Sequence, residues 1–198
     1  MLKVGLTGNI GSGKSIISEV FSTLGVPIYH ADKESRDLLL YPGVKEEVLD
    51  LLGNNILNVN KEIDRPKVAA IVFSDKDALM KLNAILHPRV ILDFLNWCEV
   101  FAGQPYVIQE AAIIYESRVE SVFDKIIHVS CPDEIAIQRV MKRDGTEEKL
   151  VLQRMQFQMK DEVKASLADY VILNDGKEMV IPQVMSIHEK LKELSIQY

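Results

Sequence analysis

The feature that most constrains this chain is a glycine-rich octapeptide near its first residue. It reads Gly8-Asn9-Ile10-Gly11-Ser12-Gly13-Lys14-Ser15 and matches the phosphate-binding pattern Gly-x4-Gly-Lys-Ser/Thr in full. A short apolar run precedes the octapeptide and an amphipathic segment follows it. That context predicts a strand that delivers a phosphate loop to the start of a helix, within a parallel α/β sheet.

The residue types of this loop suit a triphosphate. Glycines let backbone N–H groups approach phosphate oxygens with no Cβ atom in the way. The helix expected from Lys14 adds its positive N-terminal end, and the Lys14 ammonium can reach the β- and γ-phosphates. The Ser15 hydroxyl is suited to Mg²⁺. A glycine-rich turn without a ligand would leave this combination unexplained.

The rest of the chain alternates short apolar runs with helix-period segments, which is typical of a sheet covered on both faces. Five runs are predicted strands: Leu2–Thr7, Val26–His30, Tyr106–Glu110, Lys125–Ser130 and Tyr170–Leu173. Helices are predicted from about Lys14, over about Asp133–Arg143 and near the end of the chain. The first should bury one face, and the last should pack on the sheet; these faces are Ile16, Ile17, Val20, Phe21 and Leu24, and Val180, Val184, Ile187, Leu191 and Leu194.

Two stretches fall outside this alternation. Residues of about 33–103 read as several helices, broken at Tyr41-Pro42-Gly43, Gly53-Asn54-Asn55 and His87-Pro88, and we expect a substrate lobe there. Residues of about 142–165 are highly charged, and we expect a lid. The core of this single domain would then comprise residues 1–32, 104–141 and 166–198.

Composition narrows the possible partners. The net charge of −6 argues against a nucleic-acid partner, because nonspecific binding depends on neutralising phosphates. Cys98 and Cys131 form no metal-binding spacing and are expected to be reduced, buried small side chains. The chain shows no secretory segment and no apolar stretch of about 18 residues, so we expect no membrane partner and a cytoplasmic location.

Further motifs carry a resemblance that runs nearly end to end. They are Ala31-Asp32, Ile63-Asp64-Arg65, Val72-Phe73, Leu82-Asn83 with Leu86-His87-Pro88 and Val90, Ile113-Ile114-Tyr115-Glu116, Gln138-Arg139 with Arg143-Asp144, and Asn174-Asp175-Gly176. In this order and spacing the chain resembles the dephospho-CoA kinase family. The resemblance implies a three-layer P-loop kinase fold: a five-stranded parallel sheet flanked by helices, with a helical substrate lobe and a lid.

The same resemblance implies phosphorylation of the ribose 3′-hydroxyl of dephospho-CoA, with ATP as phosphoryl donor and Mg²⁺ as cofactor. Three departures are visible. The family usually has glycine at the position of Asn9, Asp-Ala-Asp at His30-Ala31-Asp32, and Pro-Leu-Leu-Phe-Glu at residues 112–116. None of them removes a group that the chemistry needs.

Candidate catalytic residues follow from the resemblance. Asp32 would orient the ribose hydroxyl or accept its proton, whereas its residue type also suits the N-cap of a helix starting near Lys33. Lys14 and Arg143 would stabilise charge on the transferred group. For substrate binding the resemblance implicates Asp32, Arg65, His87 and Glu116. The alternatives are a surface ion pair for Arg65, a helix cap or packed core histidine for His87, and a helix cap for Glu116.

ATP contacts are expected from the loop and from the later motifs. These residues are Gly11, Ser12, Gly13, Lys14, Ser15, Ile16, Arg139 and Asn174. Arg139 and Arg143, four residues apart, would share a helix face beside the triphosphate, or else form a solvated charged face. Asn174 has the alternative of a turn residue. Ser15 would ligate Mg²⁺, and Glu110, at the end of a strand, can hold the metal through water.

Other functions are kept for comparison. The nearest alternative is a kinase of another nucleotide or small metabolite alcohol. An alternative of another class is a P-loop regulatory switch, although the chain has no Asn-Lys-x-Asp guanine-binding motif. The sequence does not determine the oligomeric state.

Overall fold

The computed structural model describes residues 1–197. Within them the chain divides into two compact units, one formed by Met1–His30 with the chain from Asn96 onward, and the other by Ala31–Leu95. Each unit has its own apolar core.

The first unit is built on a parallel sheet of order β2-β3-β1-β4-β5. Its strands are β1 (Leu2–Thr7), β2 (Ile28–His30), β3 (Tyr106–Glu110), β4 (Lys125–Ser130) and β5 (Tyr170–Leu173). Four of the five predicted strands are confirmed with their bounds, and β2 is two residues shorter than predicted. Each of the four strand pairings is parallel, as the alternation of strands and helices predicts.

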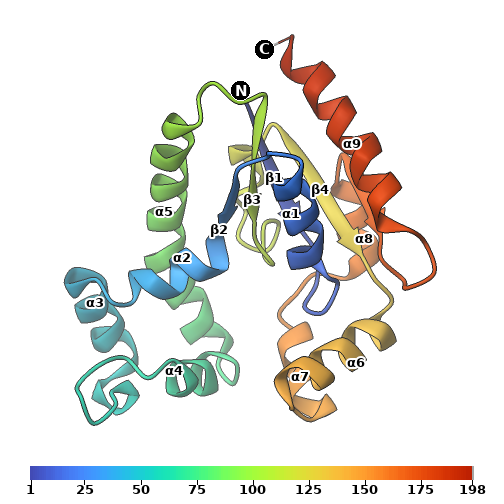
Figure 1. The fold of residues 1–198 in the computed structure, drawn as a ribbon. Coiled ribbons are helices and arrows are strands. Elements are labelled where there is room, and N and C mark those ends of the chain that lie inside the picture. Colours follow the sequence, from blue (N-terminus) through green and yellow to red (C-terminus); the bar gives the residue numbers. More distant parts are fainter. Residues whose placement is uncertain (198) are drawn as a thin grey trace. The chain divides into compact units, whose positions relative to one another are not determined.

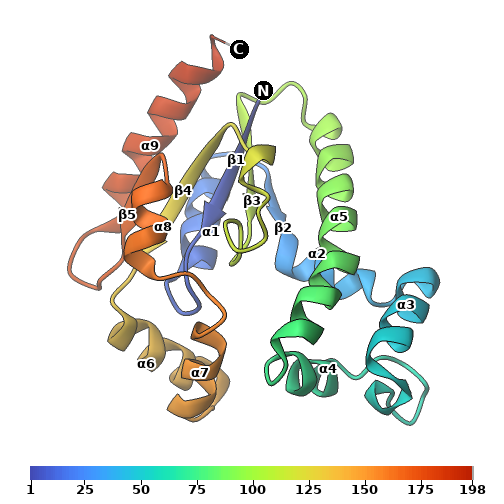
Figure 2. The ribbon, with the colours of Figure 1, turned by 180° about the vertical axis from the view of Figure 1, so that it is seen from behind.

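Helices cover both faces of this sheet, which gives the predicted three layers (Figures 1 and 2). The helices of the first unit are α1 (Lys14–Thr23), α6 (Asp133–Asp144), α7 (Glu148–Met155), α8 (Asp161–Leu167) and α9 (Val180–Ser195). α1 and α9 lie side by side on one face and α8 lies on the other (Figures 1 and 2). The strands are nearly continuously buried because helices exclude water from both sides.

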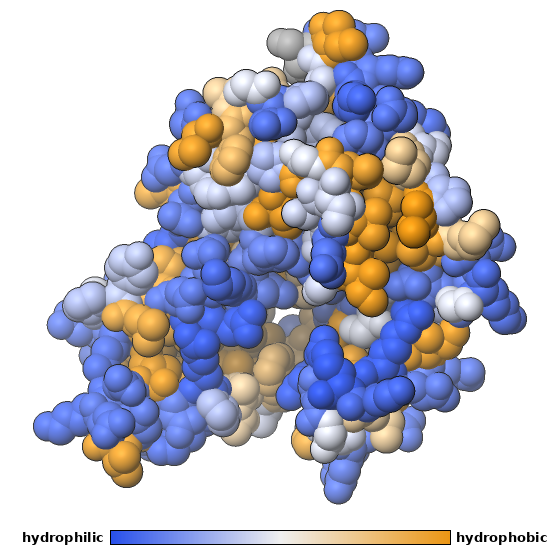
Figure 3. Space-filling model, in the orientation of Figure 1, coloured by the Kyte–Doolittle hydropathy of each residue, from blue (hydrophilic) through white to orange (hydrophobic). Residues whose placement is uncertain are grey.

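The apolar faces of α1 and α9 pack against the sheet. Ile17 and Phe21 are fully buried with Val184 and Leu191 in the main core. The prediction for α9 is confirmed, whereas the face predicted for α1 is wrong at Ile16, which is 60% exposed. A helix turns 100° per residue, so when Ile17 and Phe21 face the sheet, Ile16 lies on a different side of the helix and faces solvent. The face shown in Figure 3 is mostly hydrophilic, with apolar groups between.

The second unit is helical. It contains α2 (Ala31–Leu38), α3 (Pro42–Leu52), α4 (Arg65–Val72) and most of α5 (Lys76–Val100). Its core consists of aliphatic side chains, namely Leu39, Val44, Val48, Ile56, Ile63, Val68, Val72, Leu82 and Leu86. The predicted breaks after α2 and α3 are confirmed, since Tyr41 caps the start of α3 and Gly53 its end.

The predicted break at His87-Pro88 is wrong, because α5 continues through Pro88. A proline inside a helix removes one backbone hydrogen bond and crowds the preceding turn. Leu82, Leu86 and Val90, at four-residue spacing on either side of this point, are all buried. Burial of that continuous apolar stripe offsets the lost hydrogen bond.

Candidate active site

The phosphate loop leaves β1 at Gly8 and enters α1 at Lys14. Gly11 and Gly13 have φ angles of 80° and 92°, in the left-handed region where a side chain is strained. A Cβ atom on Gly11 would overlap the carbonyl oxygen of Ala136, and one on Gly13 would overlap Nδ2 of Asn174. Conformation therefore requires glycine at both positions, and space requires it at Gly11, where the overlapping atom belongs to the backbone.

Lys14 lies at the end of the phosphate loop, where α1 begins. Its side chain is buried, and Nζ donates to the carbonyl oxygens of Gly8 at 2.9 Å and Asn9 at 3.4 Å. The positive charge is thus held among loop carbonyls, at the N-terminal end of α1 where the helix dipole favours an anion. This is the arrangement expected of a phosphate-binding lysine.

Two predicted ATP contacts meet on one side of the loop. Arg139, on α6, donates through Nη1 to the carbonyl oxygen of Asn174 at 3.1 Å and through Nη2 to its Oδ1 at 3.4 Å. Asn174 in turn donates from Nδ2 to the Ser12 carbonyl oxygen at 2.8 Å. The structure therefore places Arg139 and Asn174 next to the phosphate loop, although they are 35 residues apart.

Ser15 and Glu110 also meet, at the carboxyl end of β3. Ser15 Oγ donates to Glu110 Oε1 at 3.0 Å, and Ser18 Oγ donates to Oε2 at 3.4 Å. His30 Nδ1 lies 2.7 Å from Oε2 of the same carboxylate. β1 and β2 both pair with β3, so three short hydrogen-bonding side chains converge on one acid at the edge where α/β proteins bind ligands.

These groups fit magnesium as P-loop proteins hold it. No cluster of three or more His, Cys, Asp or Glu side chains among residues 1–197 is arranged to hold a metal ion. Mg²⁺ keeps most of its waters and takes one or two protein ligands beside the phosphates, so a protein cage is not needed. A hydroxyl and a carboxylate 3.0 Å apart provide the oxygen donors that this ion prefers.

Glu116 has protein partners in the first unit. Its Oε1 lies 2.7 Å from Nζ of Lys164 and accepts from the Met159 amide, also at 2.7 Å. Lys164 is fully buried and also donates to the Ala112 carbonyl oxygen at 3.0 Å. Burial lowers the pKa of Lys164, while the Glu116 carboxylate opposes that shift. Glu116 thus holds the chain between α7 and α8, and its role toward the substrate stays a prediction.

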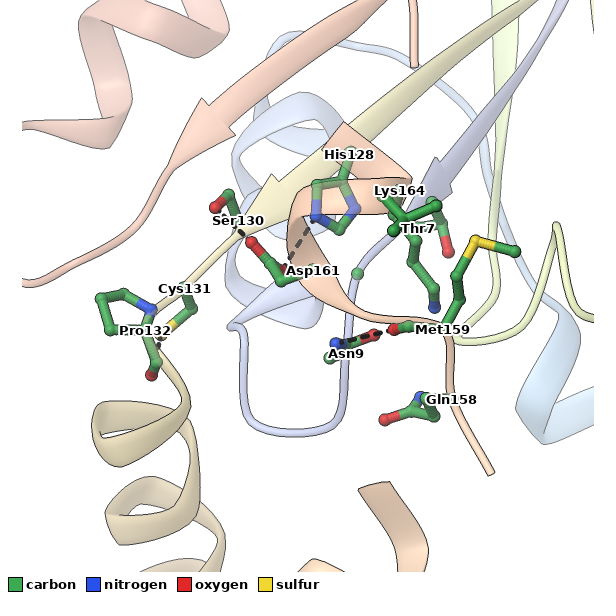
Figure 4. Close-up of polar contacts among 12 residues, drawn as sticks. Thr7, Asn9, His128, Ser130, Cys131, Pro132, Gln158, Met159, Asp161 and Lys164 are labelled. Atoms are coloured by element: carbon green, nitrogen blue, oxygen red, sulfur yellow. Dashed lines mark hydrogen bonds and ion pairs between the residues drawn. The ribbon is translucent and has the colours of Figure 1, made fainter. Parts of the chain in front are cut away.

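A second buried pair lies beside it. Asp161 joins His128 Nε2 at 2.9 Å and Ser130 Oγ at 2.5 Å, and both partners are on β4 (Figure 4). Burial alone would raise the pKa of Asp161, but these two hydrogen bonds lower it on balance. Lys164, Asp161 and His128 are not among the site residues predicted from the sequence. The available signal was the histidine within an apolar strand, since a buried imidazole needs a polar partner.

The chain between α7 and α8 also touches the phosphate loop. The Ile10 amide donates to Gln158 Oε1 at 2.9 Å, and Asn9 Nδ2 donates to the Met159 carbonyl oxygen at 3.3 Å. Figure 4 shows Asn9 facing Met159, with Gln158 nearby. The second half of the predicted lid segment is therefore bonded to the loop, to β4 and to Glu116.

The environment of Arg143 differs from that of Arg139. Its side chain is 64% exposed, and Nε donates to Asp144 Oδ1 at 2.7 Å. Arg154, on α7, also reaches Asp144, at 3.4 Å. The hydrogen bond to Asp144 raises the pKa of Arg143. A solvated ion-pair network thus describes Arg143 here, and its catalytic role stays a prediction.

The second unit contains the remaining candidates. Asp32 lies in the first turn of α2 and is exposed; because α2 begins at Ala31, Asp32 is not the N-cap of a helix starting near Lys33. Arg65 begins α4 and pairs with Asp37 at 3.2 Å, as the alternative interpretation had it. His87 is half-buried within α5, and burial lowers its pKa.

The cysteines agree with their prediction. Cys98 and Cys131 are both buried and free. Burial raises the pKa of Cys98 to about 11 and also raises that of Cys131. Neither thiol is therefore activated as a nucleophile. Separately, no helix among residues 1–197 has the length and apolar character of a membrane span.

Comparison with known proteins identifies relatives along nearly the whole chain. The family described as dephospho-CoA kinase matches residues 2–179. A dephospho-CoA kinase of Bacteroides fragilis is 34% identical over 187 residues, covering 94% of this chain and 91% of the relative. One of Porphyromonas gingivalis is 35% identical over 194 residues, covering 97% and 95%. Among solved structures, TT1252 of Thermus thermophilus superposes with a TM-score of 0.80 at 29% identity, covering 96% of each chain.

Proposed function

The chain belongs to the dephospho-CoA kinase family, and on that premise we propose how its residues transfer a phosphoryl group. The activity is ATP-dependent phosphorylation of dephospho-CoA in coenzyme A biosynthesis, and we assign the transfer to the ribose 3′-hydroxyl, giving CoA and ADP. One observation carries the site assignment: Lys14 and Asn174 each donate to a carbonyl oxygen of a phosphate loop whose φ angles tolerate no side chain at Gly11 or Gly13.

ATP is bound by the loop from Gly11 to Ile16. Backbone N–H groups at the start of α1 face the phosphates, and the Lys14 ammonium moves from the loop carbonyls to the β- and γ-phosphates when they arrive. We assign further contacts with ATP to Arg139 and Asn174, which lie beside the loop. Their mutual hydrogen bonds support this assignment, because they fix the guanidinium beside the phosphate site.

Ser15 and Glu110 are the residues that would hold Mg²⁺, the first directly and the second through a metal-bound water. When bound, the ion neutralises charge on the triphosphate and orients its oxygens. Ser18 and His30 keep the Glu110 carboxylate in place through hydrogen bonds of 3.4 Å and 2.7 Å. The Glu110 carboxylate also accepts a hydrogen bond from Ser15, and this contact supports a shared role for Ser15 and Glu110 toward the metal.

The acceptor hydroxyl is oriented, and its proton received, by Asp32. A positioned carboxylate contributes about a hundredfold or more to such a step. The exposure of Asp32 in the first turn of α2 leaves its carboxylate accessible to a ligand. We assign substrate contacts to Arg65, His87 and Glu116, with Arg65 exchanging its exposed pairing with Asp37 for an anionic group of the substrate.

Residues of about 33–103 act as the substrate lobe and residues of about 142–165 as the lid. Residues 158–161 of this segment are bonded to the phosphate loop and to β4, so the part of the lid before them is the part that closes. Its closure excludes water, which would otherwise compete as acceptor. Arg143 then turns from Asp144 toward the transferred phosphoryl group. The two buried free cysteines support a reducing, cytoplasmic location.

The test is ADP release from the purified chain with Mg²⁺-ATP and dephospho-CoA, beside nucleoside monophosphates and small alcohols. We expect turnover with dephospho-CoA alone. Lys14→Ala and Asp32→Asn should each lower kcat by about a hundredfold or more. Lys190→Ala and Glu193→Gln change an exposed ammonium and an exposed carboxylate of α9, outside the lobe and the lid, and should leave kcat unchanged.

The outcomes separate the assignments. Full turnover in Asp32→Asn would remove Asp32 from the chemistry and leave the ATP site intact. Turnover with another acceptor in preference to dephospho-CoA would overturn the substrate assignment and keep the kinase mechanism. Chelation of Mg²⁺ should abolish turnover, and its persistence would remove the metal assignment.

A further inference from the structure

A short segment, here called the strap and comprising residues 158–161, is bonded to the first half of the phosphate loop. The two hydrogen bonds are reciprocal in kind. Gln158 offers a side-chain acceptor to the backbone of Ile10, and Asn9 offers a side-chain donor to the backbone of Met159. Asn9 is only 6% exposed, so its link lies away from water, where a hydrogen bond is strong and its loss is costly.

The strap is itself fixed to the sheet. Asp161 bonds to His128 and Ser130 of β4, and the Met159 amide bonds to Glu116. His128 is the register partner of Thr7, the last residue of β1 before the loop begins. The strap is therefore bonded to the row of the sheet from which the loop departs, and this anchor gives it a rigid base from which to hold the loop (Figure 4).

The second half of the loop is held independently. Asn174 bonds to the Ser12 carbonyl, and Arg139 bonds to Asn174. The Asn9 and Ile10 contacts thus belong to a different set of supports from the residues assigned to nucleotide contact. The glycine-rich composition of the loop gives it little stiffness of its own, so its shape depends on such supports.

We propose that Asn9 and Gln158 are positioning residues for the phosphate loop. They hold its first half in the shape that receives the triphosphate, so that the loop need not be ordered when ATP binds. The proposal rests on the ATP site assigned above. A preorganised site binds more tightly because less conformational entropy is lost on binding. The residues act on ATP through the loop backbone and touch neither reacting group.

The experiment compares Gln158→Met with the wild-type chain. Methionine keeps the length of the side chain and removes the acceptor for the Ile10 amide. We expect the Kd for ATP, measured without acceptor substrate, and the KM for ATP to rise about three- to tenfold, while kcat changes by less than about twofold. The Ile10 amide should exchange faster with deuterated solvent by a similar factor.

Asn9→Ala tests the second link, and we expect the same split between KM and kcat. Because both residues act through one strap, the double variant should fall short of the product of the two single effects. Gln104→Met is the matched control, since Gln104 is an exposed glutamine outside the lobe and the lid, and it should leave all these quantities unchanged.

Two results would overturn the proposal. One is wild-type ATP affinity in Gln158→Met and Asn9→Ala while Lys14→Ala abolishes turnover, which would leave the proposed function standing without the strap. The other is lowered thermal stability with an unchanged KM, which would make the contacts structural only. Loss of ATP binding in the wild-type chain itself would instead overturn the proposed function.

Discussion

The two units of this chain are stabilised by different means. In the first unit, charged and polar side chains are buried, among them Lys14, His128 and Lys164, each with a hydrogen-bond partner. In the second unit, none of the described residues that are polar or charged is buried to that degree, and the core is aliphatic. Its ion pairs, such as Arg65 with Asp37, lie on the surface.

This difference follows from what each unit has to hold. A site for a triphosphate needs fixed donors in a place sheltered from water, and each buried polar group then requires a partner of its own. A helical unit that presents side chains at its surface can rely on apolar burial alone. Polar burial thus marks the half of the chain where charge must be positioned before the ligand arrives.

The largest expected effect is that of Gly13→Ala. The new methyl group would overlap Asn174 Nδ2, and the alanine would have to adopt the backbone φ angle of 92° that glycine has at this position. We expect kcat/KM for ATP to fall about a hundredfold, because a displacement of about 1 Å in such a site costs that much. Gly103→Ala is the control, since no atom lies within 4 Å of its added Cβ. Equal activity in both variants would contradict a shape-critical loop.

A smaller effect is expected on breaking the buried ion pair of the first unit. Lys164→Met leaves the Glu116 carboxylate buried without its cation, and we expect the free energy of unfolding to fall by about 3–5 kcal/mol in urea denaturation. Adding Glu116→Leu should restore part of that loss. In the second unit, Arg65→Ala breaks an exposed pair and should cost about 0–1 kcal/mol. Equal losses in the two units would remove the contrast between them.

The smallest effect concerns pH and the second unit. Burial lowers the pKa of His87 below its unfolded value of about 6.5, so the unfolded chain takes up this proton first as the pH falls. Stability from this group is therefore complete above about pH 6.5 and is lost as the pH falls toward the folded pKa. His87→Gln should flatten the decline in Tm between about pH 7 and 5. An unchanged slope would show that His87 does not contribute to it.

The sheet and the phosphate loop could both be predicted from the sequence. Strands buried on both faces are continuous apolar runs, so four of them could be located with their bounds, and the loop motif specifies its own chemistry. Local pattern failed where burial outweighed propensity: Pro88 lies inside α5, and Ile16 faces solvent. In both cases packing against neighbours decided the outcome, and a window of sequence does not contain those neighbours.

The polar groups that support the loop are identified by the folded structure and not by the sequence pattern. Gln158 lies 148 residues from Ile10, and Lys164 lies 48 positions beyond Glu116 in a segment whose charges suggest an exposed lid. A lysine is normally solvated, and only a partner carboxylate within hydrogen-bonding distance allows its complete burial. Such pairings depend on the spacing and register of strands brought together by folding, which is why the sequence identified the loop but not the residues that hold it.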